Sequence, residues 1–240
     1  MSECVRRGFV PTDARDFQGA SLCLLQKAQT DVAYLMDRGY DVERATTFVG
    51  DRFQFSSRQR MALIRATSSH HDVMLRQEKL FSGPLQGKTL WIDGFNTIIP
   101  LEAALSGSTD LLCMDGSARD LCGLHGSYRL IDKTDSAISL LLDALACLQP
   151  DRSVLVLDAP VSNSGRLSQR LVARAQERNL PLEPLLVPNA DALLWDKDCV
   201  ATGDAIILNR CRGWVNLCRT IIETALPDFT FTDLSGRTAS

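Results

Sequence analysis

Hydrophobic residues in the first third of the chain recur at helical spacing. The positions that carry this pattern are Leu25, Ala28, Val32, Leu35 and Met36. Further along, Ser56 and Gln59 have the spacing of a capping box at the start of another helix. Residues 13–81 contain no strand pattern. We therefore predict an all-helical N-terminal domain over residues 1–85, closed by a turn-rich linker.

From residue 88 onward, short apolar runs alternate with amphipathic helices. Runs of this kind, rich in β-forming residues, are typical of strands that are buried on both faces of a parallel sheet. The predicted strands are Lys88–Asp93, Ser153–Asp158, Leu185–Val187 and Cys199–Gly203, with a further strand at 229–234. We therefore predict a three-layer α/β domain with a parallel sheet over residues 86–240.

An aspartate ends or follows each of the first four runs. These residues are Asp93, Asp158, Asp191 and Asp204. Because the carboxyl ends of parallel strands meet at one edge of a sheet, we expect the four carboxylates to converge. Crowded carboxylates repel one another unless a cation neutralises them, and hard oxygen ligands suit Mg²⁺ or Mn²⁺. The alternative, which stays open, is that each aspartate only caps the helix that follows it.

Two polar segments between the predicted elements are further candidates for function. Residues 107–126 are rich in Gly, Asp and Ser and predict a long irregular loop. Ser162, Asn163 and Ser164 precede a predicted helix at Leu167–Arg178, where a helix N-terminus favours an anion, although a plain N-cap loop uses the same residue types. Thr134 is predicted to cap another helix.

Composition and missing motifs narrow the classes of function. The chain has 240 residues, of which 45% are hydrophobic, and a net charge of −3, which argues against a protein coated in basic residues but permits a local basic patch. No run approaches the ~20 apolar residues of a membrane span, and the N-terminus lacks a signal-peptide pattern, so we expect a cytoplasmic protein. The eight cysteines form no C-x-x-C pair and are interpreted as reduced. The motifs of P-loop, dinucleotide-binding, serine-hydrolase and zinc-protease sites are absent.

Three short motifs resemble those of a known superfamily. Asp93-Gly94-Phe95-Asn96 resembles the D-G-x-N opening of the PIN and NYN nucleases and their flap-endonuclease relatives. Ala190-Asp191 resembles their mid-domain acidic position, and Thr202-Gly203-Asp204 resembles the T-x-D motif that closes their metal site. The whole chain is similar to a prokaryotic family that pairs a helical N-terminal domain with a PIN-like domain.

This resemblance implies a PIN-like, Rossmann-like sheet and a metal-dependent phosphodiesterase, that is, a nuclease that hydrolyses RNA or single-stranded DNA. The four aspartates would hold one or two Mg²⁺ or Mn²⁺ ions and act as catalytic residues, with Glu102 a weaker ligand candidate. Asn96 would orient Asp93 or a phosphate, and Thr202 would fix the loop of Asp204. The substrate contacts implied are Asn96, Arg119, Arg129, Ser162, Asn163, Ser164, Arg166 and Thr202.

Several alternatives stay open. The chain is alternatively a non-catalytic RNA-binding module with the same fold, or a phosphohydrolase of small nucleotides. Arg58, Arg60 and Arg65 on one predicted helix suit either a phosphate backbone or a solvated surface. His125 is a weak catalytic candidate. A homodimer is an open question, since PIN-like domains often dimerise.

Overall fold

The computed structural model describes residues 5–123 and 126–236. Before the first strand, the described chain is helical. Its helices are α1 (Asp13–Asp16), α2 (Gly19–Met36), α3 (Val42–Phe53), α4 (Ser57–Ala66) and α5 (His70–Glu78). The predicted capping box is confirmed, because the Ser56 hydroxyl accepts from the Gln59 N–H and the Ser56 N–H donates to the Gln59 side chain at 3.0 Å.

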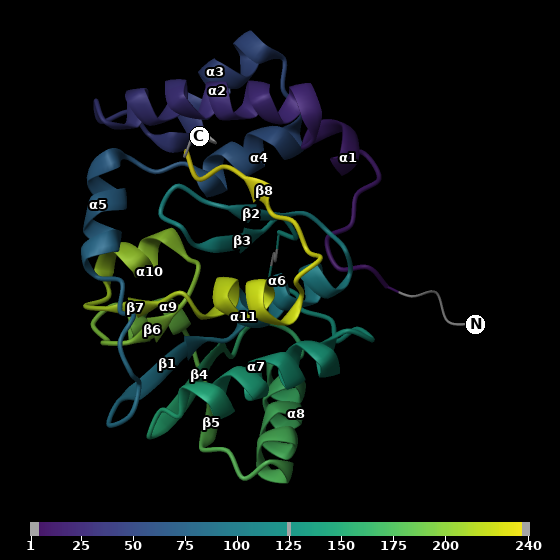
Figure 1. Ribbon diagram of the computed structural model, residues 1–240, viewed down its shortest axis with the longest axis vertical. Coiled ribbons are helices and arrows are strands. Elements are labelled where there is room, and N and C mark those ends of the chain that lie inside the picture. Colours follow the sequence, from purple (N-terminus) through teal and green to yellow (C-terminus); the bar gives the residue numbers. More distant parts are fainter. Residues whose placement is uncertain (1–4, 124–125, 237–240) are drawn as a thin grey trace.

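The predicted parallel sheet lies at the centre of the remaining chain and has five strands (Figure 1). Its strands, in spatial order, are β5 (Leu182–Val187), β4 (Arg152–Asp158), β1 (Thr89–Asp93), β6 (Val200–Ala201) and β7 (Trp214–Val215). Every neighbouring pair is parallel. The four strands that precede the aspartates are therefore consecutive neighbours in one sheet.

Helices cover both faces of this sheet. On one face lie α6 (Phe95–Leu105), α7 (Thr134–Leu148), α8 (Ser164–Glu177) and α11 (Leu217–Ala225), and on the other lie α9 (Ala190–Leu194) and α10 (Ala205–Arg210). Strand β4 shows how the sequence produces these layers. Leu155 and Leu157 pack into the first core, whereas Val154 and Val156 pack into the second, because successive side chains of a strand point to opposite faces.

The prediction of an irregular loop over residues 107–126 is wrong. This segment contains an antiparallel pair, β2 (Asp110–Leu112) and β3 (Ala118–Asp120), and β8 (Thr232–Asp233) adds a parallel strand to β2. Gly116, with φ of +83°, lies in the turn between β2 and β3, where a left-handed backbone favours glycine. The sequence signal failed because these strands are short and one partner lies at the far end of the chain.

The small sheet packs against the N-terminal helices (Figure 1). Leu111, Cys113, Leu121 and Leu234 share one buried core with apolar side chains of α2, α3 and α4. This core draws on residues from both sides of residue 86. The helices are thereby anchored on the α/β part of the molecule by hydrophobic burial, which supplies the main driving force for such packing.

Two smaller expectations are also settled. Thr134 is the first residue of α7 and not its cap, since Lys133 occupies the N-cap position. The seven cysteines in the described part of the chain are free, as predicted. No helix in that part is long and apolar enough to cross a bilayer.

Candidate functional site

The structure brings the four predicted aspartates to one edge of the central sheet. Asp93 and Asp158 are the last residues of β1 and β4, Asp191 lies in the first turn of α9 after β5, and Asp204 is the N-cap of α10 after β6. We call this set the aspartate edge. The negative charges of Asp204 and Asp191 both act on Asp93, and those of Asp204 and Asp158 act on Asp191. The four side chains are therefore close enough to influence one another.

Asp93 is the most buried member of the aspartate edge. Its side chain accepts hydrogen bonds from Asn96 Nδ2 at 2.8 Å and from Thr202 Oγ1 at 2.7 Å, both uncharged donors. Burial, with a smaller contribution from the charges of Asp204 and Asp191, raises the pKa of Asp93 to about 7 despite these two bonds. The carboxylate thus lacks the positive partner that a buried anion needs.

Two glycines beside Asp93 and Asp204 are required by close packing. A Cβ at Gly94 would lie 2.8 Å from the carbonyl oxygen of Val156 on β4, and a Cβ at Gly203 would lie 2.7 Å from that of Ala118 on β3. Both positions therefore exclude larger residues. This packing explains the glycine in each motif and brings the small sheet against the aspartate edge.

The other three aspartates are held less tightly. Asp204 Oδ1 accepts from the backbone N–H groups of Ile206 and Ile207, as an N-cap does, and Thr202 Oγ1 accepts from the Asp204 N–H at 3.0 Å. One oxygen of Asp158 accepts from the Ala190 N–H at 2.8 Å. The cap interpretation is correct for Asp204, yet it accounts for one carboxylate oxygen only. Capping and ion binding therefore remain compatible.

The donor chemistry of the aspartate edge fits a hard divalent cation. The four side chains offer carboxylate oxygens as metal ligands. Burial, together with the charges of Asp204 and Asp158, raises the pKa of Asp191. Within residues 5–123 and 126–236, however, no group of three or more acidic, His or Cys side chains already has the spacing of a metal site. The carboxylate ligands match Mg²⁺ or Mn²⁺, whereas formation of a metal site from them would require the side chains to move.

A cleft of about 340 Å³ adjoins Asn96 and Asp204. Val42, Ile64 and Arg65 of the N-terminal helices also line it. Sequence reasoning missed this cleft because no local pattern shows which helix residues lie beside the aspartate edge. An apolar wall next to polar groups is typical of a small-molecule or nucleotide site.

Arg119, a predicted phosphate ligand, is held by internal contacts at the edge of this cleft. Its guanidinium pairs with Asp115, donates to the carbonyl oxygens of Gly203 and Arg65, and leaves the residue only 8% exposed. Asp115 also pairs with Arg76 at 2.6 Å. Arg119 therefore joins β3 to the loop before Asp204, a structural use that the sequence did not reveal.

Other predicted contacts are divided between internal and exposed positions. Ser162 Oγ and Asn163 Nδ2 donate to the Tyr128 carbonyl, and Ser164 Oγ donates to that of Ala159, so these groups fix the loop before α8. Arg129 and Arg166 lie nearby with exposed side chains. Two exposed guanidinium groups thus lie at the predicted anion site, while the smaller polar groups of this loop serve the fold. His125 lies outside the described residues.

Glu102 is not a metal ligand in this structure. It is fully buried in α6, where Oε1 accepts from Tyr128 and Thr134 and Oε2 pairs with Arg7 at 2.8 Å. Burial raises its pKa, although these donors and the Arg7 charge oppose the shift. A buried carboxylate with this many partners stabilises packing between elements.

The arginines of α4 also make internal contacts. Arg58 pairs with Asp13 and donates to the carbonyls of Gly8 and Leu121, and Arg60 donates to those of Phe55 and Thr47. A third, Arg65, donates to the Asp120 carbonyl at 2.7 Å. These internal bonds account for the presence of the three arginines in α4, and none of them requires a bound nucleic acid.

Comparison with known proteins gives the family. Residues 24–79 match the model described as "Protein of unknown function (DUF434)", and residues 82–220 match "Domain of unknown function (DUF5616)". "Uncharacterized protein MJ0935" of Methanocaldococcus jannaschii is 37% identical over 185 residues, which cover 77% of this chain and 88% of that protein. No solved structure matches. Because the second model covers more than half of the chain, this protein belongs to the family described as Domain of unknown function (DUF5616).

Proposed function

We propose that this protein is a metal-dependent nuclease that hydrolyses RNA at the aspartate edge. One observation carries the proposal: Asp93, Asp158, Asp191 and Asp204 end or follow four neighbouring parallel strands. The charges of Asp191 and Asp204 act on the buried Asp93, and that of Asp158 acts on Asp191. A protein retains such repulsion where a bound cation offsets it. The order of the motifs along the chain, which resembles that of PIN and NYN nucleases, supports the same function.

In this proposal the chain's own residues position the reaction. The four carboxylates would hold one or two Mg²⁺ or Mn²⁺ ions, which would supply Lewis acidity. Asn96 and Thr202 fix the orientation of Asp93, and the N-terminus of α10 fixes that of Asp204. The adjoining cleft receives the part of the substrate next to the scissile phosphate.

We propose that the central sheet is PIN-like and that residues 1–85 form a helical domain beside a catalytic domain at 86–240. The parallel order of the strands and the aspartates at their carboxyl ends support the first part. The second part rests on the run of five helices before β1. A crystal structure of residues 86–240 as a stable fragment would test that division.

Cleavage of a labelled single-stranded RNA by the purified full chain tests the activity. With Mn²⁺ we expect cleavage that EDTA abolishes and that Asp93→Asn lowers by about 100-fold or more, because loss of a metal ligand removes transition-state stabilisation. Asp228→Asn, an exposed aspartate after α11, is the matched control and should leave the rate unchanged.

The same assay separates the alternatives. If RNA binds in a salt-dependent way but is not cleaved with any divalent ion, the protein is a non-catalytic binding module. The capping bond of Asp204 is the observation that favours this second candidate, since it explains one motif residue without chemistry. Turnover of small phosphate esters without oligonucleotide binding would instead indicate a phosphohydrolase.

A further inference from the structure

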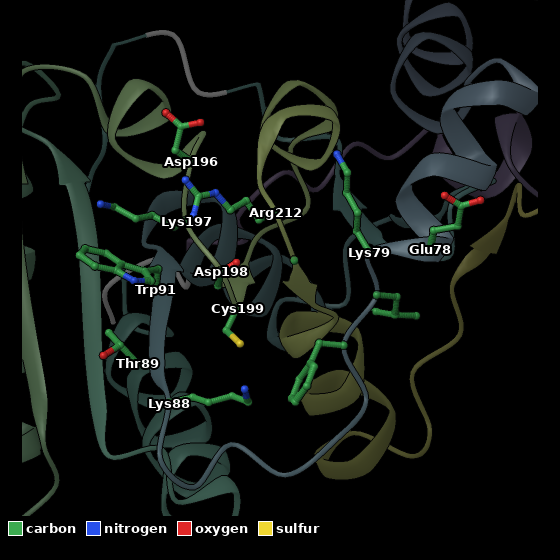
Figure 2. A pocket seen from close by; sticks show the side chains of 13 residues that line it. Glu78, Lys79, Lys88, Thr89, Trp91, Asp196, Lys197, Asp198, Cys199 and Arg212 are labelled. Atoms are coloured by element: carbon green, nitrogen blue, oxygen red, sulfur yellow. The ribbon is translucent and has the colours of Figure 1, made fainter.

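A second hollow lies at the opposite, amino edge of the central sheet. It has a volume of about 560 Å³ and is shown in Figure 2. Lys88 precedes β1, Asp198 and Cys199 precede β6, and Arg212 precedes β7, so the residues at the starts of three parallel strands line it. Asp93 and Asp204 lie at the other ends of β1 and β6. The hollow, which we call the amino-edge pocket, is therefore separate from the aspartate edge.

Four cationic side chains line the amino-edge pocket, and ion pairs do not neutralise them. They are Lys79, Lys88, Lys197 and Arg212. Three carboxylates, those of Glu78, Asp196 and Asp198, also line the pocket, but within residues 5–123 and 126–236 none lies within ion-pair distance of these cations. Lys79 Nζ donates to the Asn209 carbonyl at 2.7 Å, so Lys88, Lys197 and Arg212 are the cations whose charge is available to a ligand. An unpaired cluster of this kind attracts an anion.

Aromatic rings hold two of these cations in place. Lys88 Nζ lies 5.0 Å from the centre of the Phe81 ring, and Lys197 Nζ lies 4.7 Å from that of Trp91. Figure 2 shows Lys88, Lys197 and Trp91 around the same opening. The pocket thus combines cations with two partly buried aromatic side chains. This combination matches a ligand that carries both a phosphate and a planar ring.

Backbone hydrogen bonds build the walls of the pocket. The Phe81 N–H donates to the Trp214 carbonyl at 2.8 Å and the Trp214 N–H to the Lys79 carbonyl at 3.0 Å, so residues 79–81 run alongside β7. The Arg212 N–H donates to the Lys197 carbonyl at 3.0 Å, which places these two cations on adjacent segments. The cations are therefore presented by fixed backbone, as expected of a binding site.

We propose that the amino-edge pocket binds the phosphate and base of a nucleoside phosphate. The phosphate would lie among Lys88, Lys197 and Arg212. The base would stack on Trp91 or Phe81, at the ring face that Lys197 or Lys88 covers, once the phosphate has drawn that cation away. The volume lies within the range of about 300–1,000 Å³ that is usual for small-molecule sites. The ligand is either a free mononucleotide or one nucleotide of an RNA strand, which share this chemistry. The proposal does not rest on the nuclease activity, because the site uses none of the aspartates.

Calorimetric titration of the full chain with AMP, in EDTA, tests the site without any metal-dependent reaction. We expect AMP to bind, and adenosine, which lacks the phosphate, to bind at least about tenfold more weakly, equivalent to 1.4 kcal/mol. The double variant Lys88→Glu/Lys197→Glu should weaken AMP binding by at least about the same factor. Lys27→Glu/Arg44→Glu, with both residues exposed on N-terminal helices, changes the net charge equally and should leave the affinity unchanged.

Three results would overturn the proposal: equal affinity for adenosine and AMP, no effect of the pocket variant, or an equal loss in the control variant. Arg212→Gln, at an exposed position, replaces the double variant if that protein does not fold. A ten-nucleotide RNA then distinguishes the two sources. If RNA displaces AMP and the pocket variant lowers its salt slope by about two, the site holds an RNA strand, whereas displacement by mononucleotides alone identifies a free nucleotide. Binding of neither AMP nor RNA rejects both.

Discussion

Asp93 at the aspartate edge and Asp115 in the turn between β2 and β3 are equally buried but have opposite electrostatic surroundings. Each residue is 4% exposed. Burial raises the pKa of Asp93 to about 7, and the like charges of Asp204 and Asp191 add to it. Burial also opposes ionisation of Asp115, but Arg119 and Arg76 outweigh it and lower its pKa to about 2. The chain supplies a positive partner for Asp115 and leaves Asp93 without one.

This contrast indicates different uses for the two carboxylates. The triad of Asp115, Arg119 and Arg76 is complete within the chain and ties the small sheet to α5. The aspartate edge is complete only when a cation is added. Substitutions at the two places should therefore have opposite effects on stability, and only one place should respond to divalent ions.

The largest expected effect is that of Asp115→Ala. Removing this carboxylate leaves two buried guanidinium groups uncompensated, and the loss of one partner from such a buried ion pair costs about 3–5 kcal/mol. Urea denaturation at pH 7 measures the change in the free energy of unfolding. A change below about 1 kcal/mol, comparable to that of the exposed control Asp228→Ala, would show that the triad contributes little.

The next effect has the opposite sign. Because the folded-state pKa of Asp93 lies above its unfolded value, its contribution to stability is fully present below about pH 4 and is lost as pH rises through about 7. In EDTA, wild-type stability should therefore fall over this range by about 2–4 kcal/mol more than that of Asp93→Asn. Denaturation curves of both proteins at pH 5 and pH 8 measure this difference. If the free energy of unfolding changed with pH equally in the wild type and in Asp93→Asn, the raised pKa of Asp93 would be contradicted.

Divalent ions should stabilise the wild type at pH 8. A ligand at 100 times its dissociation constant stabilises the folded state by about 2.7 kcal/mol. We expect Mn²⁺ to raise the midpoint of thermal unfolding of the wild type and of Asp228→Asn but not that of Asp93→Asn. The shift should shrink at pH 5, because protons compete with the metal for the carboxylates. An undiminished shift in Asp93→Asn would place the ion elsewhere.

The smallest effect separates two members of the aspartate edge. Asp204→Ala removes the N-cap of α10 and should cost about 1 kcal/mol in EDTA. Asp191→Ala should cost less, since no hydrogen bond to the Asp191 carboxylate forms in the part of the chain that the structure describes. Denaturation in EDTA compares the two variants, and Mn²⁺ should stabilise neither. Stabilisation of Asp191→Ala equal to that of the wild type would exclude Asp191 as a ligand.

The sequence was sufficient where local patterns dominate. The runs ending at Asp93 and Asp158 predicted buried parallel strands because such strands are apolar on both faces, and Ser56 with Gln59 predicted a helix start because a capping box is local chemistry. The convergence of the aspartates also followed from sequence, since parallel strands share one carboxyl edge. The roles of these residues in catalysis remain predictions.

Tertiary structure decided which polar side chains are free and which are already used. Arg119 has the residue type of a phosphate ligand, but the fold brings it to Asp115 and Gly203. Glu102 has the residue type of a metal ligand, but the fold surrounds it with Arg7, Tyr128 and Thr134. The pairing of β2 with β8 and both pockets likewise depend on segments far apart in the chain. Hydrophobic periodicity is a local signal and fixes the elements, whereas contacts between distant elements determine the charge around each side chain.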